Sequence, residues 1–383
     1  MKRIYLDHNA TTPIHPQVLK AMLPMLKENF GNPSSIHWFG QQAHHALENA
    51  REQVASLLNA QPAEIFFTSG GTEADNLAIK GGIAAAPGKT RSGHIITSQI
   101  EHNAVLKTCR YLEKQGHAVT YLPVDKYGVI KLDELGKAIN DNTVLISIMF
   151  ANNETGSIQP VENICELVAA VNKQRAAKNI KPLVFHTDAV QAVGKLPIDL
   201  QKLEIDLLSL SAHKINGSKG VGALYIRKGA LIKPQILGGH HEKNMRAGTE
   251  NMPGIVALGE ACEIAKKTLQ KEIKHLTKLR DILWSGISKN IEYVQLNGHS
   301  EKRLPNTLNV SFEFIEGESL LLNLDLKGIA ASTGSACTSG STEPSHVLSA
   351  MGVEPVKAQG SLRFSLGLNN TEEEIKYVIK TLP

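Results

Sequence analysis

The feature that most constrains the fold is an alternation of short apolar runs with helix-like stretches over the first 211 residues. Runs this short and apolar are typical of strands buried on both faces, and helices between successive strands favour parallel pairing. The first two thirds of the chain therefore predict an α/β fold with a mostly parallel sheet flanked by helices. The apolar runs are 64–70, 94–98, 118–124, 143–150, 183–188 and 206–211, and the helical stretches are 71–86, 103–116, 132–139 and 161–178.

The last third of the chain has a different organisation. A long amphipathic helix is predicted from about Ile255 to Lys289, followed by strands over 306–314 and 361–367. A capping box of Thr371 and Glu374 begins the last predicted helix. A chain of 383 residues is long enough for two domains. We expect a large α/β domain over 16–254 and a smaller α+β domain formed by 1–15 and 255–383.

Composition excludes several classes of function. The formal net charge is only +4 and the signs are mixed, so neither direct nucleic-acid binding nor an anionic membrane surface is expected. No apolar run is long enough to span a membrane, and no long apolar stretch follows Lys2 and Arg3 as in a secretory signal. Four cysteines without metal-site spacing predict neither a disulfide framework nor a metal site, which favours a cytoplasmic location. The "GGHH" stretch at 238–241 is interpreted as a polar loop.

Polar side chains follow five of the predicted strands. Ligands of parallel sheets bind beyond the carboxyl ends of the strands, so these residues predict a site. They are Thr72, which follows Gly71, then His102, Asn152 and Asn153, Asp188 and Gln191, and Ser211, His213 and Lys214.

The residue types fit the needs of one cofactor, pyridoxal phosphate. This cofactor requires a lysine for its aldehyde, an acid for its ring nitrogen and a cup for its phosphate. Glycines before a helix, as at Gly71, offer backbone N–H groups to a phosphate. Taken singly, Lys214 is more often a solvated lysine and Asp188 more often a cap. The interpretation therefore depends on Asp188, Gln191 and Lys214 occurring together.

Seven motifs then carry a resemblance along essentially the whole chain. They are "YLDHNATTP", "TSGGTEADNLAIKG", "ANNETGSIQP", "HTDAVQAVGK", "SAHKINGSKGVGALY", "RAGTEN" and "STGSACTSG". In this order they resemble the cysteine desulfurases of the NifS/IscS family, which are fold-type I pyridoxal-phosphate enzymes of the aminotransferase class V group.

The resemblance implies a role for each matching residue around the cofactor. Lys214 is implied to form the Schiff base, Asp188 to contact the ring nitrogen, Gln191 the ring hydroxyl, and His102 to stack on the ring and assist catalysis. The phosphate and the remaining cofactor contacts are implied for Gly71, Thr72, Asn153, Ser211 and His213, and for Thr249 of a second subunit.

The substrate is implied to be L-cysteine, with its carboxylate held by Asn153 and Arg363. An arginine suits that task because its planar fork meets a carboxylate with two hydrogen bonds. Cys337, in the motif "STGSACTSG", is implied by the resemblance to be the persulfide cysteine, and its Gly/Ser/Thr-rich flanks are typical of a loop. Cys109, Cys165 and Cys262 fall in helical patterns and are expected to be buried and inert.

The implied activity is therefore a cysteine desulfurase that converts L-cysteine to L-alanine and leaves the sulfur on Cys337. A homodimer is implied, with an iron–sulfur scaffold or another sulfur-acceptor protein as partner, for cluster assembly or tRNA thiolation. The resemblance implies no bound metal beyond a transient contact of Cys337 with an iron–sulfur cluster. Two alternatives stay open: a selenocysteine lyase or other class V enzyme, and a catalytically idle scaffold.

Overall fold

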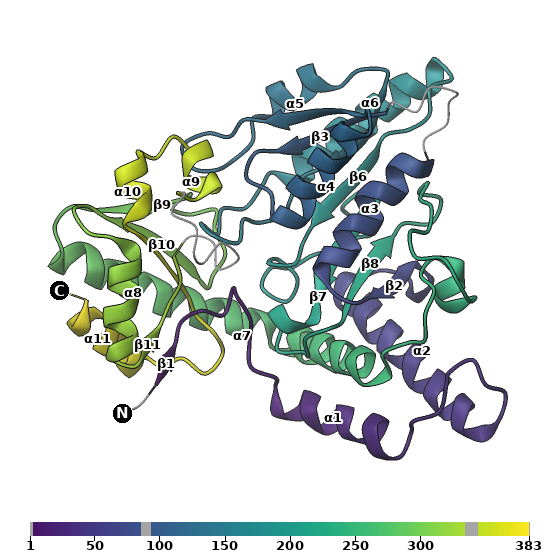
Figure 1. The fold of residues 1–383 in the computed structure, drawn as a ribbon, viewed down its shortest axis with the longest axis horizontal. Coiled ribbons are helices and arrows are strands. Elements are labelled where there is room, and N and C mark those ends of the chain that lie inside the picture. Colours follow the sequence, from purple (N-terminus) through teal and green to yellow (C-terminus); the bar gives the residue numbers. More distant parts are fainter. Residues whose placement is uncertain (1–2, 86–92, 334–343, 383) are drawn as a thin grey trace.

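A seven-stranded sheet forms the centre of the computed structural model, which describes residues 3–85, 93–333 and 344–382 (Figure 1). Strands β7, β6, β5, β3 and β4 are parallel, while β8 runs antiparallel to both of its neighbours. The expected mostly parallel sheet is confirmed. In spatial order the strands are β2 (Ile65–Thr68), β8 (Gly222–Ile226), β7 (Leu207–Ser211), β6 (Val184–Asp188), β5 (Thr143–Ser147), β3 (His94–Ser98) and β4 (Ala118–Leu122).

Helices cover both faces of this sheet because successive strand residues point to opposite sides. Phe66 packs in the core beneath α3 and α4, whereas Phe67 packs in the core on the opposite face. The helices of the first face are α3 (Gly71–Ala85) and α4 (Asn103–Lys114). The helices on the opposite face of this sheet are α1 (Pro16–Lys27), α2 (Trp38–Leu58), α5 (Leu132–Ala138), α6 (Val161–Ala177) and the first half of α7 (Met252–Asn290).

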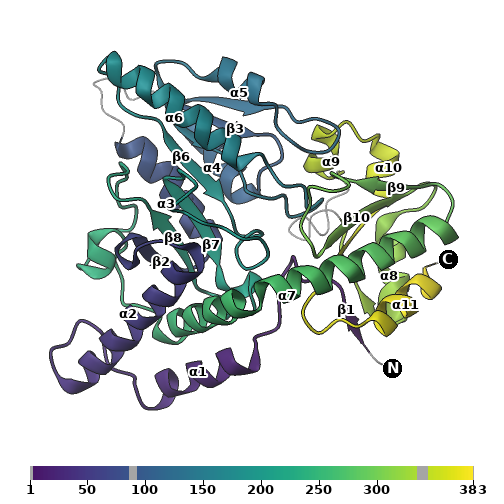
Figure 2. The same ribbon diagram turned by 180° about the vertical axis from the view of Figure 1, so that it is seen from behind.

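A separate core surrounds a small, three-stranded antiparallel sheet in the order β12, β10, β9. The long helix α7 reaches it with its second half, as Figure 2 shows. Ile4 and Leu6 pack here too, because β1 pairs in parallel with β11. The other elements around this core are β1 (Ile4–Tyr5), β9 (Val294–Asn297), β10 (Thr307–Phe312), β11 (Ile329–Ala330), β12 (Ser361–Ser365), α8 (Gly317–Leu326) and α11 (Glu372–Thr381). Helices α9 (His346–Ala350) and α10 (Pro355–Gln359) pack in a smaller cluster with Ile100 and Met149.

Helix α7 packs against both the large sheet and the small sheet. Ile255 and Cys262 pack with the large sheet, whereas Leu276 and Leu283 pack with the small one. The domain division at residue 255 stays a prediction. The expected capping box of Thr371 and Glu374 is present at the start of α11.

One strand of the large sheet was not predicted. Strand β8 follows β7 with only a short 3₁₀ turn and no α-helix between them, since antiparallel neighbours need no crossover connection. The predicted strand 143–150 also ends earlier, at Ser147.

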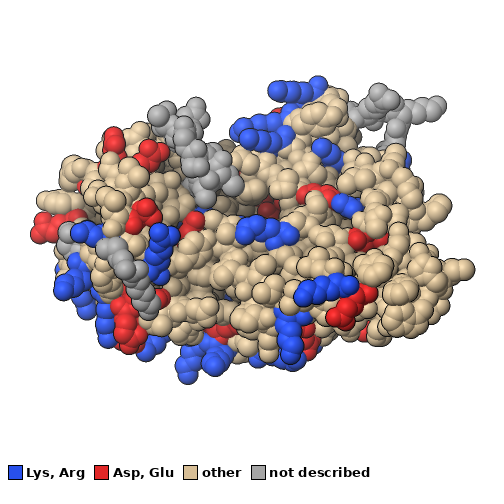
Figure 3. Space-filling view, turned by 60° about the horizontal axis from the view of Figure 1, so that its bottom comes forward, with Lys and Arg blue, Asp and Glu red and all other residues tan. Residues whose placement is uncertain are grey.

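The surface shows no gathering of one charge on the face drawn in Figure 3, where basic and acidic residues are interspersed. Within the described part of the chain, no helix combines the length and apolar character needed to cross a bilayer.

Candidate active site

The last residue of β6, Asp188, delivers a buried carboxylate to the carboxyl edge of the sheet. Its Oδ1 atom accepts a hydrogen bond of 2.9 Å from the Val190 N–H, which turns the chain away from the strand. Burial raises the pKa of Asp188, and the nearby His102 and Lys214 act in the opposite direction. A cation placed against this carboxylate would therefore be strongly favoured.

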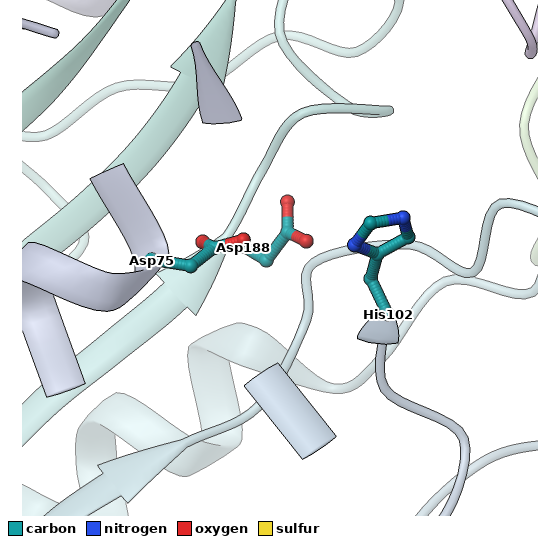
Figure 4. A group of neighbouring side chains, drawn as sticks. All are labelled: Asp75, His102 and Asp188. Carbon is teal, nitrogen blue, oxygen red and sulfur yellow. The ribbon is translucent and has the colours of Figure 1, made fainter. Parts of the chain in front are cut away.

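Asp75 and His102 lie beside Asp188, with one polar atom of each residue within 4.8 Å of the others. Figure 4 shows the Asp188 carboxylate between Asp75, from α3, and the ring of His102. Burial, followed by the charge of Asp188, raises the pKa of Asp75 well above its usual range. Its Oδ1 atom has no hydrogen-bond partner among the described residues. The two carboxylates repel each other, so a proton held between or beside them is stabilised.

His102 is the N-cap of α4, and its Nδ1 atom accepts a 3.1 Å hydrogen bond from the Ala104 N–H. This bond assigns the ring proton to Nε2 and fixes the orientation of the imidazole. The preceding residue, Glu101, is fully buried, and burial raises its pKa to about 8.

Lys214 ends the short 3₁₀ helix η2 (Ala212–Lys214) that follows β7. Its Nζ atom donates to the carbonyls of Asn9 at 2.5 Å and Ala10 at 2.8 Å. The segment after β1 is hydrogen-bonded to the same turn, since the Thr12 N–H donates to the His213 carbonyl at 2.9 Å. The backbone carbonyls of residues 9 and 10 thus hold the lysine amine at the edge of the large sheet.

Gln191 and the buried Lys195 lie next to this lysine. Gln191 Nε2 donates to the Asn9 carbonyl at 3.0 Å, and Lys195 Nζ donates to Gln191 Oε1 at 3.0 Å. Burial and the charges of Lys214 and Arg363 lower the pKa of Lys195 to about 7. Sequence reasoning missed Lys195, although its place four residues after Gln191 in the same motif was a usable signal.

Gly71 and Thr72 begin α3, where backbone N–H groups face the end of the sheet. A Cβ atom on Gly71 would lie 2.7 Å from Val190 Cγ2 and 3.7 Å from Ser211 Cβ, which places Ser211 beside this helix start. Thr72 is exposed and Ser211 is buried. His213 Nδ1 lies 3.2 Å from the Thr11 hydroxyl. A helix start with adjoining hydroxyls is suited to a phosphate.

Thr249 lies on the surface, in the segment between η3 (His241–Asn244) and α7. Arg246 of this segment pairs with Glu73 of α3, with Nε and Oε1 2.9 Å apart. The segment is therefore attached to the first turn of the helix that Gly71 and Thr72 begin.

Arg363, in β12 of the small sheet, contacts Asn153, which follows β5 of the large sheet. Arg363 is 2% exposed, and its guanidinium donates to the Asn153 carbonyl at 3.1 Å and to Asp7 Oδ1 at 2.8 Å. Its Nε atom is buried without a hydrogen-bond partner among the described residues. This N–H is available to an acceptor that the described residues do not supply.

Cys337 lies outside the described residues. Ser332, before that stretch, exchanges backbone hydrogen bonds of 3.1 and 2.7 Å with Arg363. Ser345, after it, donates from Oγ to Glu154 Oε2 at 2.5 Å. Both attachments therefore lie next to the arginine and the Asn153 region. The prediction that the other three cysteines are buried is confirmed, and none of them is in a disulfide: Cys109, Cys165 and Cys262.

The chain matches a known protein family over nearly its whole length. A family described as aminotransferase class-V matches residues 4–378. The chain belongs to the class-V aminotransferase family. This family assignment was the one that the motifs predicted, and its members depend on pyridoxal phosphate.

Several curated class-V relatives align along the full chain. A protein named cysteine desulfurase IscS from Methanosarcina thermophila is 56% identical over 382 residues, which cover 100% of this chain and 91% of that protein. One with the same name from Dictyoglomus turgidum is 52% identical, covering 100% of this chain and 94% of that protein.

Solved structures agree in fold. A structure named NifS-like protein gives a TM-score of 0.91 with 46% identity, covering 100% of this chain and 98% of the other. A structure described as SspA in complex with cysteine gives a TM-score of 0.82 with 37% identity, covering 95% and 99%.

The site fits the cofactor of the class-V enzymes. Asp188 is a buried carboxylate that a protonated ring nitrogen would neutralise, and Lys214 presents an amine nearby. The start of α3 offers donors for a phosphate. The individual roles assigned by resemblance stay predictions.

Proposed function

We propose that the chain is an L-cysteine desulfurase, a pyridoxal-phosphate enzyme that removes sulfur from L-cysteine and releases L-alanine. The observation that carries the proposal is the grouping of Asp188, His102 and Lys214 at one sheet edge. It occurs in a chain aligned end to end with proteins named cysteine desulfurase. A structural neighbour bound to cysteine supports the substrate.

The cofactor would be held by residues from several strand ends. When bound, pyridoxal phosphate supplies an electron sink for the substrate α-carbon. Lys214 would hold its aldehyde carbon, Asp188 its ring nitrogen, Gln191 its ring oxygen and His102 its ring face. The proposed phosphate ligands are Gly71, Thr72, Ser211 and His213, with Thr249 of a second copy, and Asn153 is a further cofactor contact.

Two residues are proposed to hold the substrate carboxylate. Arg363 is suited to this because its buried Nε–H lacks an acceptor among the described residues, while its other contacts hold the guanidinium in place. Asn153 would complete the grip. The Lys214 amine then takes the proton from the α-carbon, and His102 Nε2 assists the transfer.

Cys337 is proposed to accept the sulfur. Its thiolate attacks the substrate sulfur and forms an S–S bond, while the electron pair of the broken C–S bond stays on carbon and takes a proton. The attachment of Ser332 and Ser345 beside Arg363 and Glu154 supports this assignment, because the intervening chain starts and ends near the carboxylate grip. The persulfide sulfur would pass to an iron–sulfur scaffold or another acceptor protein.

A homodimer is part of the proposal. Apolar side chains are exposed along α1 and the segment that follows it, including Leu26, Phe30, Ile36 and Trp38. Phe30 and Trp38 both contact the half-exposed Phe39, and an exposed apolar surface of this kind is typical of an interface. We further propose that Thr249 of each copy contacts the other copy's site. The buried, unbridged cysteines are consistent with a reducing cytoplasm.

The test is an assay of purified protein with L-cysteine. We expect a yellow protein whose visible spectrum changes on adding L-cysteine, with equal amounts of alanine and transferred sulfur. The Lys214→Ala variant is the control and should lose both products. A yellow wild-type protein that forms no alanine would favour the idle scaffold, and activity on selenocysteine alone would favour the lyase.

A further inference from the structure

Lys195 is a buried lysine for which the proposed reaction has no use. It is 9% exposed and lies in the turn after β6. Its Nζ atom donates to the Gln191 backbone carbonyl at 3.3 Å and to the Gln191 side-chain oxygen at 3.0 Å. Burying an amine is costly, and an apolar side chain of similar length would fill this space without that cost.

The contacts of Gln191 determine which way its carboxamide faces. Oε1 accepts from Lys195, and Nε2 donates to the Asn9 carbonyl at 3.0 Å. Rotating the amide by half a turn would bring Oε1 against the Asn9 oxygen and the amide nitrogen against the lysine amine. The observed orientation is therefore fixed by a donor at one end and an acceptor at the other.

This orientation leaves one N–H of Gln191 on the side of Lys214. A carboxamide nitrogen carries two protons, and Asn9 takes one of them. Among the described residues, Nε2 has no second acceptor. The Asn9 carbonyl also receives Lys214 Nζ at 2.5 Å, so the amide nitrogen and the lysine amine are neighbours.

We propose that Lys195 is a positioning residue: it holds the Gln191 side chain by its oxygen, so that the amide N–H points to the ring oxygen of bound pyridoxal phosphate. The inference rests on the cofactor role proposed for Gln191. Lys195 acts through this amide and does not touch the substrate. Its amine donates the required hydrogen bond whether it is protonated or neutral.

The test uses the purified holoprotein and its visible absorption. The pH at which the cofactor's visible band changes reports on hydrogen bonds to the ring oxygen, because a donor there stabilises the less protonated form. Lys195→Met keeps the length of the side chain and removes the donor. We expect its spectroscopic midpoint to rise by about one to two pH units, the size of one charge-assisted hydrogen bond.

A double-variant comparison separates positioning from a direct charge effect. In a Gln191→Ala background, Lys195→Met should move the midpoint no further, because the residue through which Lys195 acts is absent. Lys202→Met is the matched control: this exposed lysine pairs with Asp199 at 3.5 Å, and its loss should leave the midpoint unchanged.

Three results would overturn the inference. An unchanged midpoint in Lys195→Met would do so, as would an equal shift in the Gln191→Ala background. A wild-type protein with no cofactor band would reject the proposed function and this inference together. Lys195→Leu, which fills the same interior, replaces the methionine variant if that variant does not fold.

Discussion

Replacing Glu242 should release the surface segment that carries Thr249. Three consecutive residues of η3, from Glu242 to Asn244, have φ values of 44°, 54° and 67°. A left-handed backbone costs about 1–2 kcal/mol per non-glycine residue, so this turn persists only because other contacts hold it.

A buried ion pair supplies those contacts. Arg51 reaches both carboxylate oxygens of Glu242 at 2.8 Å, and the Phe67 N–H donates to the same carboxylate at 2.8 Å. The Arg51 and Glu242 side chains are 4% and 3% exposed. Glu242 therefore ties the turn to α2 and β2 at once.

Glu242→Ala removes the bidentate partner of the buried guanidinium, which keeps only Glu48 Oε1 at 3.1 Å and the Ile65 carbonyl at 2.7 Å. Losing that partner costs at most about 3–5 kcal/mol. It also orphans the Phe67 N–H, at about 1–3 kcal/mol. Releasing the three left-handed residues recovers about 3–6 kcal/mol, since each returns the cost given above. Local opening of the segment is therefore the cheaper response, and global unfolding should shift less than the lost contacts suggest.

Limited trypsin digestion measures this opening, because Lys243 and Arg246 lie in the segment. We expect faster cleavage there in Glu242→Ala than in wild type. Glu134→Ala is the control, since its ion pair with Lys137 is exposed, and it should digest as wild type does. The Arg51→Met/Glu242→Leu double variant should have a higher urea midpoint than Glu242→Ala, because it removes the buried guanidinium together with its bidentate partner. Wild-type cleavage of Glu242→Ala, or a double variant no more stable than the single one, would refute the reasoning.

The remaining predictions concern the site itself. Arg363→Lys should raise KM for L-cysteine roughly ten- to a hundredfold in steady-state alanine assays, since the fork is lost; an unaltered KM would assign the carboxylate to other residues. Cys337→Ser should stay yellow and dimeric yet make almost no persulfide or alanine, and mass spectrometry of wild type should find the extra sulfur on the Cys337 peptide rather than on Cys109, Cys165 or Cys262. Burial raises the pKa of Glu101 to about 8, so between about pH 4.5 and 8 the folded chain keeps a proton that the unfolded chain releases, and this residue's contribution to stability falls as pH rises. Glu101→Gln should therefore lower the urea midpoint more at pH 5.5 than at pH 8; an equal loss at both values would contradict the shift.

The sequence predicted most of the large sheet because its parallel strands are short apolar runs, and β3, β4 and β5 are each followed by a helix. Strand β8 lacked that signal, since it follows the Lys214 turn with glycines around it and pairs antiparallel to β7. The positions of Lys214 and Asp188 could be inferred from strand ends. Their surroundings could not, because Asn9 and Ala10 lie more than 200 residues from Lys214 in sequence and contact it through their backbone carbonyls.

Asp75 and Lys195 were missed for a related reason. Asp75 occupies an interior position of a helical pattern, where an aspartate is ordinarily solvent-facing, and only the packing of α3 on the sheet buries it beside Asp188. From the sequence, Lys195 is expected to be a solvated loop lysine, whereas the fold buries it. Burial that arises from tertiary packing leaves no local periodicity to detect.

The turn that contains Asn9 has a consequence for protein synthesis. The Asn9 N–H donates to the Ser365 hydroxyl across 356 residues of sequence, and the same segment receives the Lys214 amine. At ribosomal speeds of about 5–20 residues per second, Asn9 waits roughly 20 to 70 seconds for this partner. The lysine pocket is therefore completed only after translation has passed β12, so stable cofactor loading should be a late event, and nascent chains stalled before residue 361 should remain colourless.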